Sequence, residues 1–145
     1  MIALIQRVDE ASVSVAGTCV GAIGCGLLAL IGVEPADGDA NVRRMTERLL
    51  GYRVFADAAG KMNCSVRDIS GGLLLVPQFT LAADTKKGMR PSFSSAAAPE
   101  VATRLFDQLV GAVSAQYAPV ACGRFGADMR VALVNNGPVT FWLQA

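Results

Sequence analysis

The chain has 145 residues, of which 52% are hydrophobic and 17% are charged, and its formal net charge is +1. This length predicts one domain, residues 1–145, and the large apolar share predicts that a second subunit covers part of its surface. The sequence contains no histidine, which excludes Ser-His, Cys-His and histidine–metal mechanisms.

Neither a membrane span nor an export signal is evident. The longest apolar stretch, residues 24–33, is about ten residues long, whereas a membrane helix needs roughly 20. The opening residues carry Arg7 after their apolar positions and lack the small-residue cleavage site of a signal peptide. A cytoplasmic protein without membrane contact is therefore expected.

The four cysteines form no CxxC pair, and no histidine is present to complete a zinc site. No metal and no cofactor are predicted. We expect buried or half-buried free thiols at Cys19, Cys25, Cys64 and Cys122.

The N-terminal third of the chain predicts three strands. Alternating apolar residues indicate a strand over 1–15 that is interrupted near Asp9–Glu10. A turn at Gly17 leads into a second strand over 19–23. The continuous apolar run 27–33 is typical of a strand buried on both faces.

A helix and three further strands follow. Apolar residues recur at helical spacing over 39–51, with acidic residues at the start, and indicate an amphipathic helix. A short strand over 53–56 leads through a turn into another. The segment LLLVPQFTLAA, residues 73–83, has the composition of a central strand, but Pro77 cannot donate to a ladder and therefore indicates an edge, a bulge or a strand end.

The remaining segments complete a mixed α/β pattern. Residues 83–99 lack periodicity and predict a long loop. Pro99 suits the first turn of a second helix that reaches about Tyr117, although Ala98 is a poor N-cap unless Ser95 or another group replaces it. Two strands, 128–134 and 139–143, close the chain. The predicted fold is a curved mixed β-sheet, a partial barrel of seven or eight strands, with two main helices.

Two polar motifs interrupt these apolar segments. In PQFTL, residues 77–81, a glutamine and a threonine follow a proline that ends backbone pairing. In NNGPVT, residues 135–140, Asn136-Gly137 is a strong hairpin signal, yet Pro138 follows where a new strand should begin to donate. Taken singly, each motif also fits an ordinary structure, with Gln78 and Thr80 facing solvent and Asn136-Gly137 forming a turn.

Together the motifs make the chain resemble the D-aminoacyl-tRNA deacylases over essentially its whole length. The blocks MIALIQRV, GYRVF, GKMN, QFTLAADT, GMRPSF and NNGPVTFWLQ occur in the order of that family. The family motifs are Ser-Gln-Phe-Thr-Leu and Asn-x-Gly-Pro-Val-Thr. One departure is Pro77, which stands where the family usually has serine, so either an assisting hydroxyl is lost or proline simply ends the strand as serine would; we favour the second.

The resemblance implies a homodimer with active sites at the interface. In the family the Gly-Pro bond is cis, and the pair enters the active site of the other subunit, so Gly137 and Pro138 would face the aminoacyl group. The implied reaction is hydrolysis of the ester of D-aminoacyl-tRNA, which releases the D-amino acid. A backbone wall would reject L side chains by clash, accept many D side chains and tolerate glycine.

The resemblance also implies roles for individual residues. The backbone N–H groups of Phe79 and Thr80 would hold the developing oxyanion, and Gln78 would orient the substrate. The neighbouring 2′-hydroxyl of the RNA would help to activate water. A Thr80 nucleophile is the competing mechanism, disfavoured because no base is evident nearby.

Other residues would hold the substrate. Arg7 would orient the Gly-Pro segment, although a plain surface arginine is the alternative. Met89 and Phe93 would line the adenosine pocket. Phosphate contacts are expected from Lys86, Lys87 and Arg90, whose other interpretation is a solvated loop.

Three alternatives stay open. A related tRNA deacylase with a trans Gly-Pro bond would admit a small L-amino acid such as alanine. A non-catalytic dimeric RNA-binding module would need a more strongly basic surface than a net charge of +1 suggests. A plain structural dimer would leave the two polar motifs unexplained.

Overall fold

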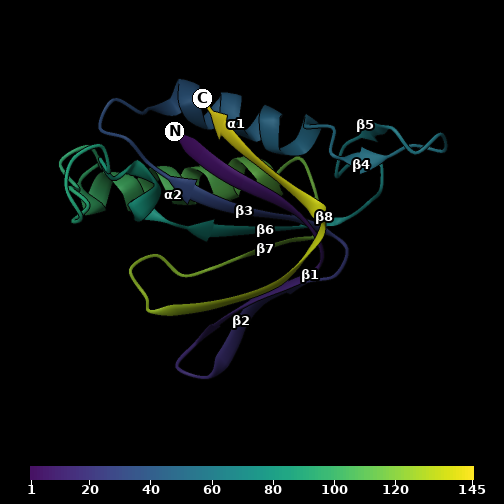
Figure 1. The fold of residues 1–145 in the computed structure, drawn as a ribbon, viewed down its shortest axis with the longest axis horizontal. Coiled ribbons are helices and arrows are strands. Elements are labelled where there is room, and N and C mark those ends of the chain that lie inside the picture. The colour runs from purple at the N-terminus through teal and green to yellow at the C-terminus, as the bar shows by residue number, and fades with distance from the viewer.

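A strongly bent β-sheet carries two helices on one face in the computed structural model, which describes residues 1–145 (Figure 1). The predicted class, a curved mixed α/β sheet with two main helices, is confirmed. The elements in chain order are β1 (Ile2–Val15), β2 (Thr18–Ile23), β3 (Gly26–Gly32), α1 (Asp39–Gly51), β4 (Phe55–Ala56), β5 (Met62–Cys64), β6 (Gly72–Pro77), the 3-10 helix η1 (Phe79–Ala82), α2 (Pro99–Ser114), β7 (Val120–Cys122) and β8 (Met129–Gln144).

The long strand β1 organises the main sheet. On one edge its first half pairs with β3 and its second half with β2, while β8 follows the other edge along almost the whole of β1. The strand order is β2-β1-β3-β6-β7, with β3–β6 and β6–β7 parallel. Strands β4 and β5 form a separate hairpin that projects from the body (Figure 1). The main sheet therefore has six strands rather than the seven or eight predicted, because β4 and β5 form a separate hairpin.

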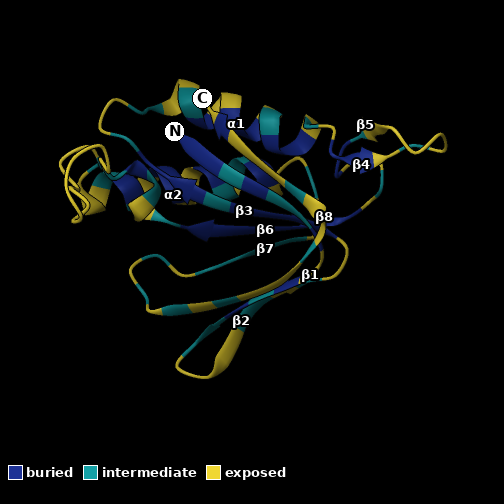
Figure 2. Ribbon diagram, viewed as in Figure 1, coloured by how far each residue is buried: buried dark blue, intermediate teal, exposed yellow.

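The sheet separates two hydrophobic clusters because its central strands are apolar on both faces. In β6, Leu73 and Leu75 join a cluster of 22 buried residues, while Leu74 and Val76 join a cluster of six on the opposite face. Figure 2 shows β6 buried along its length, as the continuous apolar run requires. The sequence prediction that 27–33 is buried on both faces is confirmed for β3 in the same way.

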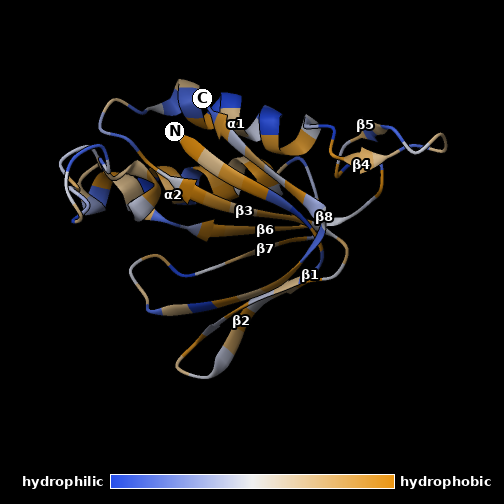
Figure 3. Ribbon diagram, viewed as in Figure 1, coloured by the Kyte–Doolittle hydropathy of each residue, from blue (hydrophilic) through white to orange (hydrophobic).

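The helices cover the larger cluster. Helix α1 buries residues at the spacing of one helical face, including Val42, Met45 and Leu49, and its polar residues lie on the outer side (Figure 3). Helix α2 begins with Pro99 and ends at Ser114, short of the predicted Tyr117. No side chain caps its N-terminus, because the hydroxyl of Ser95 donates instead to the carbonyl oxygen of Ala82, 2.6 Å away. Neither helix is long and apolar enough to cross a membrane.

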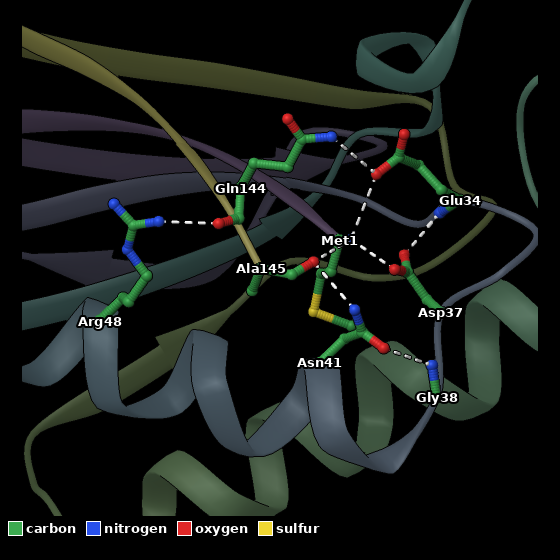
Figure 4. Close-up of polar contacts among 8 residues, drawn as sticks. All are labelled: Met1, Glu34, Asp37, Gly38, Asn41, Arg48, Gln144 and Ala145. Carbon is green, nitrogen blue, oxygen red and sulfur yellow. Dashed lines mark hydrogen bonds and ion pairs between the residues drawn. The ribbon is translucent and has the colours of Figure 1, made fainter.

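Both chain ends meet in a polar cluster beside α1 (Figure 4). The buried α-amino group of Met1 donates to the carboxylates of Glu34 and Asp37 and to the carbonyl oxygen of Ala145. The side-chain amide of Asn41 donates to the same carbonyl oxygen at 2.9 Å. The buried charge is therefore paired and hydrogen-bonded, the condition under which burial is tolerated.

Three predictions of the sequence analysis need correction. The two C-terminal strands are one, β8, and β1 runs unbroken through Asp9–Glu10, although its register with β8 shifts there. For the segment 73–83, the strand-end alternative is the correct one, because β6 ends at Pro77 and η1 follows. Cys19 and Cys25 are exposed rather than buried, since they lie on the outer strand β2 and in the turn after it; Cys64 and Cys122 are half-buried as expected, and all four are free.

Candidate active site

Pro77 marks the end of a central strand. The N–H of Leu73 donates to Pro119 on the β7 side, and the N–H of Gln78 donates to Ile31 on the β3 side at 2.7 Å. Because donor directions alternate along a strand, position 77 faces the β7 side, beyond Cys122, the last residue of β7. A missing N–H interrupts no strand pairing there, so the strand-end interpretation of Pro77 is correct.

The residues after Pro77 turn into η1 and expose a polar group. The side-chain amide of Gln78 donates to the hydroxyl of Thr80, which is exposed. Phe79 and Thr80 open the 3-10 helix, where the first N–H groups have no intrahelical acceptor, and no side chain accepts from them. Two adjacent donors are therefore free for a ligand oxygen. No carboxylate or amine hydrogen-bonds the Thr80 hydroxyl.

A cavity of about 450 Å³ opens beside this strand end. Its walls are mostly apolar, with Gln78 as the polar side chain, a composition suited to an organic ligand held by few polar contacts. It is lined by Val76, Pro77, Gln78, Phe79, Ala97, Pro99, Ala102, Phe125, Gly126, Ala127, Met129 and Val131. Phe125 was not among the predicted site residues, although an aromatic residue between Gly123 and Gly126 in a loop is a usable signal.

The loop between η1 and α2 approaches the same end of the sheet. The Phe93 ring packs on that of Phe79 with centroids 5.1 Å apart. Asp84 and Ser92 exchange two backbone hydrogen bonds, which close the intervening residues into an exposed lobe. The lobe carries Lys86, Lys87, Met89 and Arg90, all exposed, and none of its three cations forms a salt bridge.

The second motif is a bulge in the middle of β8. Gln6 pairs with Thr140 and Val8 with Asn135, so the four residues Asn136 to Val139 stand opposite Arg7 alone. Asn136-Gly137 is therefore not a hairpin turn: the strand continues past it on the same partner. The Gly137–Pro138 peptide bond is cis, and Gly137 has a φ of +136°.

Arg7 holds this bulge. Its Nε donates to the carbonyl oxygen of Asn136 at 3.0 Å, and its Nη1 donates to that of Val54, just before β4, at 2.7 Å. The interpretation of Arg7 as a plain surface arginine is wrong, because the side chain is half-buried and bonded at both ends. A Cβ at Gly137 would lie 2.6 Å from Cγ2 of Val139 and 3.0 Å from Nη2 of Arg7, so only glycine fits.

Asn135 stabilises the bulge through two side-chain hydrogen bonds to residues of β8. Its side-chain oxygen accepts from the N–H of Val139, and its nitrogen donates to the hydroxyl of Thr140, both at 2.9 Å. The first and last residues of the motif, Asn135 and Thr140, thus close the bulge. The exposed Gly137 and Pro138 form its projecting part.

One chain does not bring the two motifs together. Arg7 pairs with Leu27 of β3, whereas Gln78 bonds to Ile31, four residues further along the same strand. That is roughly 13 Å along the strands, and the three strand spacings from β8 to β6 add roughly 14 Å across them. In Figure 1 the end of β6 and the bend of β8 lie at opposite ends of the sheet.

The shifted pKa values belong to another region. Hydrogen bonds from Asn63 and Lys61 lower the pKa of Asp57, those from Ser65 lower the pKa of Asp68, and burial raises the pKa of Tyr117. All three residues lie in or near the β4–β5 hairpin and the loop after it. No three histidine, cysteine, aspartate or glutamate side chains are grouped so that they could hold a metal ion.

Known proteins resemble the chain in sequence and in fold. A protein of Alkalilimnicola ehrlichii named D-aminoacyl-tRNA deacylase is 63% identical over 145 residues, which cover all of this chain and 97% of that protein. One of the same name from Methylococcus capsulatus is 64% identical over 99% of this chain and 94% of its own length.

Two solved structures share the fold over nearly the full length of both chains. A c-Myc DNA unwinding element binding protein has a TM-score of 0.95 at 37% identity, covering 100% of this chain and 99% of the other. A probable eukaryotic D-amino acid tRNA deacylase has a TM-score of 0.85 at 17% identity, covering 99% and 98%. The family model described as D-Tyr-tRNA(Tyr) deacylase matches residues 4–144. The chain therefore belongs to the D-Tyr-tRNA(Tyr) deacylase family.

Proposed function

We propose that the protein hydrolyses the ester that joins a D-amino acid to the terminal ribose of tRNA, as a cytoplasmic homodimer with two shared active sites. The observation that carries the proposal is the separation of the two motifs within one chain. The Gly137–Pro138 bulge lies opposite Arg7, which pairs with Leu27 of β3, whereas the donors of Phe79 and Thr80 follow the end of β6, next to Ile31, which also belongs to β3. A second copy can supply the bulge to the donors and complete the site.

The exposed apolar side chains of β8 support a dimer. Four large apolar side chains on this strand are at least one-third exposed, including Phe141 at 37% and Trp142 at 52%. In addition β8 pairs only with β1, so its other edge is free. Apolar side chains gathered on one free strand mark a surface that a partner covers. We take that partner to be a second copy, since the bulge belongs to the same strand.

The chemistry needs no titrating side chain. An aminoacyl ester is already activated, so water attacks the carbonyl carbon, the bond to the ribose oxygen breaks, and that oxygen takes the proton. The N–H groups of Phe79 and Thr80 hold the negative charge that develops on the carbonyl oxygen. Gln78 orients the ester, and the neighbouring ribose hydroxyl helps to activate water.

Selectivity comes from backbone atoms. Gly137 and Pro138 of the partner would stand where an L side chain projects, so that an L ester is rejected by clash while D side chains and glycine fit. The cavity of about 450 Å³ beside Gln78 leaves space for many side chains. The same enzyme would therefore also hydrolyse mischarged glycyl-tRNA.

The loop after η1 would hold the tRNA. Lys86, Lys87 and Arg90 offer three unpaired positive charges on one exposed lobe, suited to phosphates of the acceptor end. Phe93, packed on Phe79, and the exposed Met89 would line the adenosine pocket. Aromatic faces bind unstacked bases of single-stranded RNA in this way.

Deacylation of matched D-Tyr-tRNA, L-Tyr-tRNA and glycyl-tRNA tests the proposal. Wild type should release D-tyrosine and glycine but not L-tyrosine above the uncatalysed rate. Pro138→Ala frees the backbone angle that proline fixes and should lower kcat/KM for the D ester about 100-fold, the cost of a small misplacement in a site. Pro35→Ala, at an exposed proline before α1, is the matched control and should be unaffected.

Two results would contradict the proposal. Equal hydrolysis of both esters by wild type would point to a deacylase without a chiral filter. Tight tRNA binding with no hydrolysis of any ester would favour the RNA-binding module.

A further inference from the structure

Arg7 and Asp9 of β1 both bind the residue that precedes Gly137. Arg7 donates to the backbone carbonyl oxygen of Asn136, and the carboxylate of Asp9 accepts from the Asn136 side-chain amide at 2.5 Å. Residues two apart in a strand point to the same face, so these side chains reach the same side of the bulge. Asn136 is thus held at its carbonyl and at its side chain.

These two residues of β1 are also the ones without a register partner in β8. The ladder passes from Gln6–Thr140 to Val8–Asn135 and then to Glu10–Val134, which leaves Arg7 and Asp9 unpaired between them. Their side chains therefore replace the backbone pairing at the place where the strand bulges. The position of the bulge depends on these side-chain contacts and on Asn135.

We propose that Asp9 is a positioning residue for the chiral filter, acting through Asn136; this inference rests on the proposed function. Arg7 holds the backbone carbonyl of Asn136, and Asp9 holds its side-chain amide. Together the two contacts fix the orientation of the peptide group that joins Asn136 to Gly137. Asp9 and Asn136 are both exposed, and a single exposed contact of this kind contributes little to stability, so its effect falls on geometry.

An exchange of the two side chains tests the contact. Asn136→Asp alone places two carboxylates against each other, which repels the bulge from β1. The double variant Asp9→Asn/Asn136→Asp restores one amide donor and one carboxylate with their places exchanged. Glu10→Gln is the matched control, because it removes a neighbouring exposed carboxylate that makes no hydrogen bond to the bulge.

The measurements are kcat and KM for D-Tyr-tRNA, the total rate of L-tyrosine release from L-Tyr-tRNA, and the urea midpoint of unfolding. Asn136→Asp should lower the ratio of D to L hydrolysis roughly tenfold, a size that directly bonded pairs reach in double-mutant cycles. The loss should lie mainly in kcat for the D ester, with the urea midpoint unchanged. The double variant should return the ratio to within about threefold of wild type.

The outcomes separate this inference from the function on which it rests. A selective wild type whose D-to-L ratio is unchanged by Asn136→Asp would overturn the role of Asp9 and leave the proposed function standing. A loss that follows the urea midpoint and is not restored in the double variant would make the contact merely structural. If wild type shows no D-specific hydrolysis, both the proposed function and the role of Asp9 are wrong.

Discussion

Pro77 stands where the family motif has serine. Its position at the end of β6 predicts that proline here costs little activity or stability. Its missing N–H faces the β7 side beyond the end of that strand. Pro77→Ser should therefore change kcat/KM for the D ester by no more than about threefold and the free energy of unfolding by about 1 kcal/mol. Steady-state deacylation and urea unfolding measure both. Gln78→Ala, one residue on, is the matched variant that should lower activity.

A tenfold or greater gain of kcat in Pro77→Ser would contradict this account. It would mean that a hydroxyl before Gln78 assists the reaction, and that the chain works with a weakened site.

At the residue scale, the sequence predicts which side chains belong to the site but not which groups they contact. The candidates Gln78, Phe79 and Thr80 were found from their motif, and they do lie together at one strand end. The hydrogen-bond partners of Arg7 could not be predicted, because both are backbone carbonyl oxygens, of Val54 and Asn136. Every residue has such a carbonyl, so the sequence does not show which one a side chain will bind.

Among the elements, the long periodic segments were predicted correctly, whereas the turn inferred from the Asn136-Gly137 pair was not. The buried strand β3 and helix α1 follow from hydrophobic pattern alone. Asn136-Gly137 predicts a turn by local preference, yet β8 continues because pairing with β1 on both sides of the bulge outweighs that preference. The cavity lining around Phe125 depends on how a loop folds back on the end of β6, and its only local signal in the sequence is an aromatic residue between two nearby glycines.

The β4–β5 hairpin gives a prediction about pH. The side-chain amide of Asn63 and the N–H groups of Lys61 and Ala59 donate to Asp57, which lowers the pKa of its carboxyl from the ordinary value of 3.8. A group whose folded pKa is lowered stabilises above its unfolded pKa, and that stability is lost as the pH falls through the folded value. Asp57→Asn should therefore lower the urea midpoint at pH 7, and the difference from wild type should shrink below pH 3.8.

Asp107→Asn is the control for this titration, because Asp107 is exposed on α2 and accepts no hydrogen bond. Its urea midpoint should follow wild type at every pH. A difference between wild type and Asp57→Asn that persists unchanged into acid would show that the asparagine acts through packing rather than through charge.

At the scale of the whole molecule, a bent sheet between two cores places the two motifs at opposite ends of one chain. The first half of β1 packs with β3 and the helices, while its second half turns away to pair with β2, and β8 follows both halves. The bulge is set at this bend. The rigid sheet therefore keeps the two motifs apart within one chain, and under the proposed function a second copy brings them together.

Mixing two impaired variants tests this requirement directly. Gln78→Ala and Pro138→Ala each impair one half of a shared site, so each homodimer should have little activity left. In a mixed dimer the intact Gln78 of one chain meets the intact Pro138 of the other, and one of the two sites is restored. Random exchange of equal amounts should therefore recover about a quarter of wild-type activity. If both motifs acted within one chain, no activity would return.

The matched control places both changes in one chain and mixes it with wild type. A mixed dimer then has no intact site, because each site combines an intact half with a defective one. Activity should fall to about a quarter of that of an equal total amount of wild type, against about a half if each chain carried its own site. The two mixtures contain the same side chains in the same amounts. Their comparison therefore measures only which chain supplies the bulge.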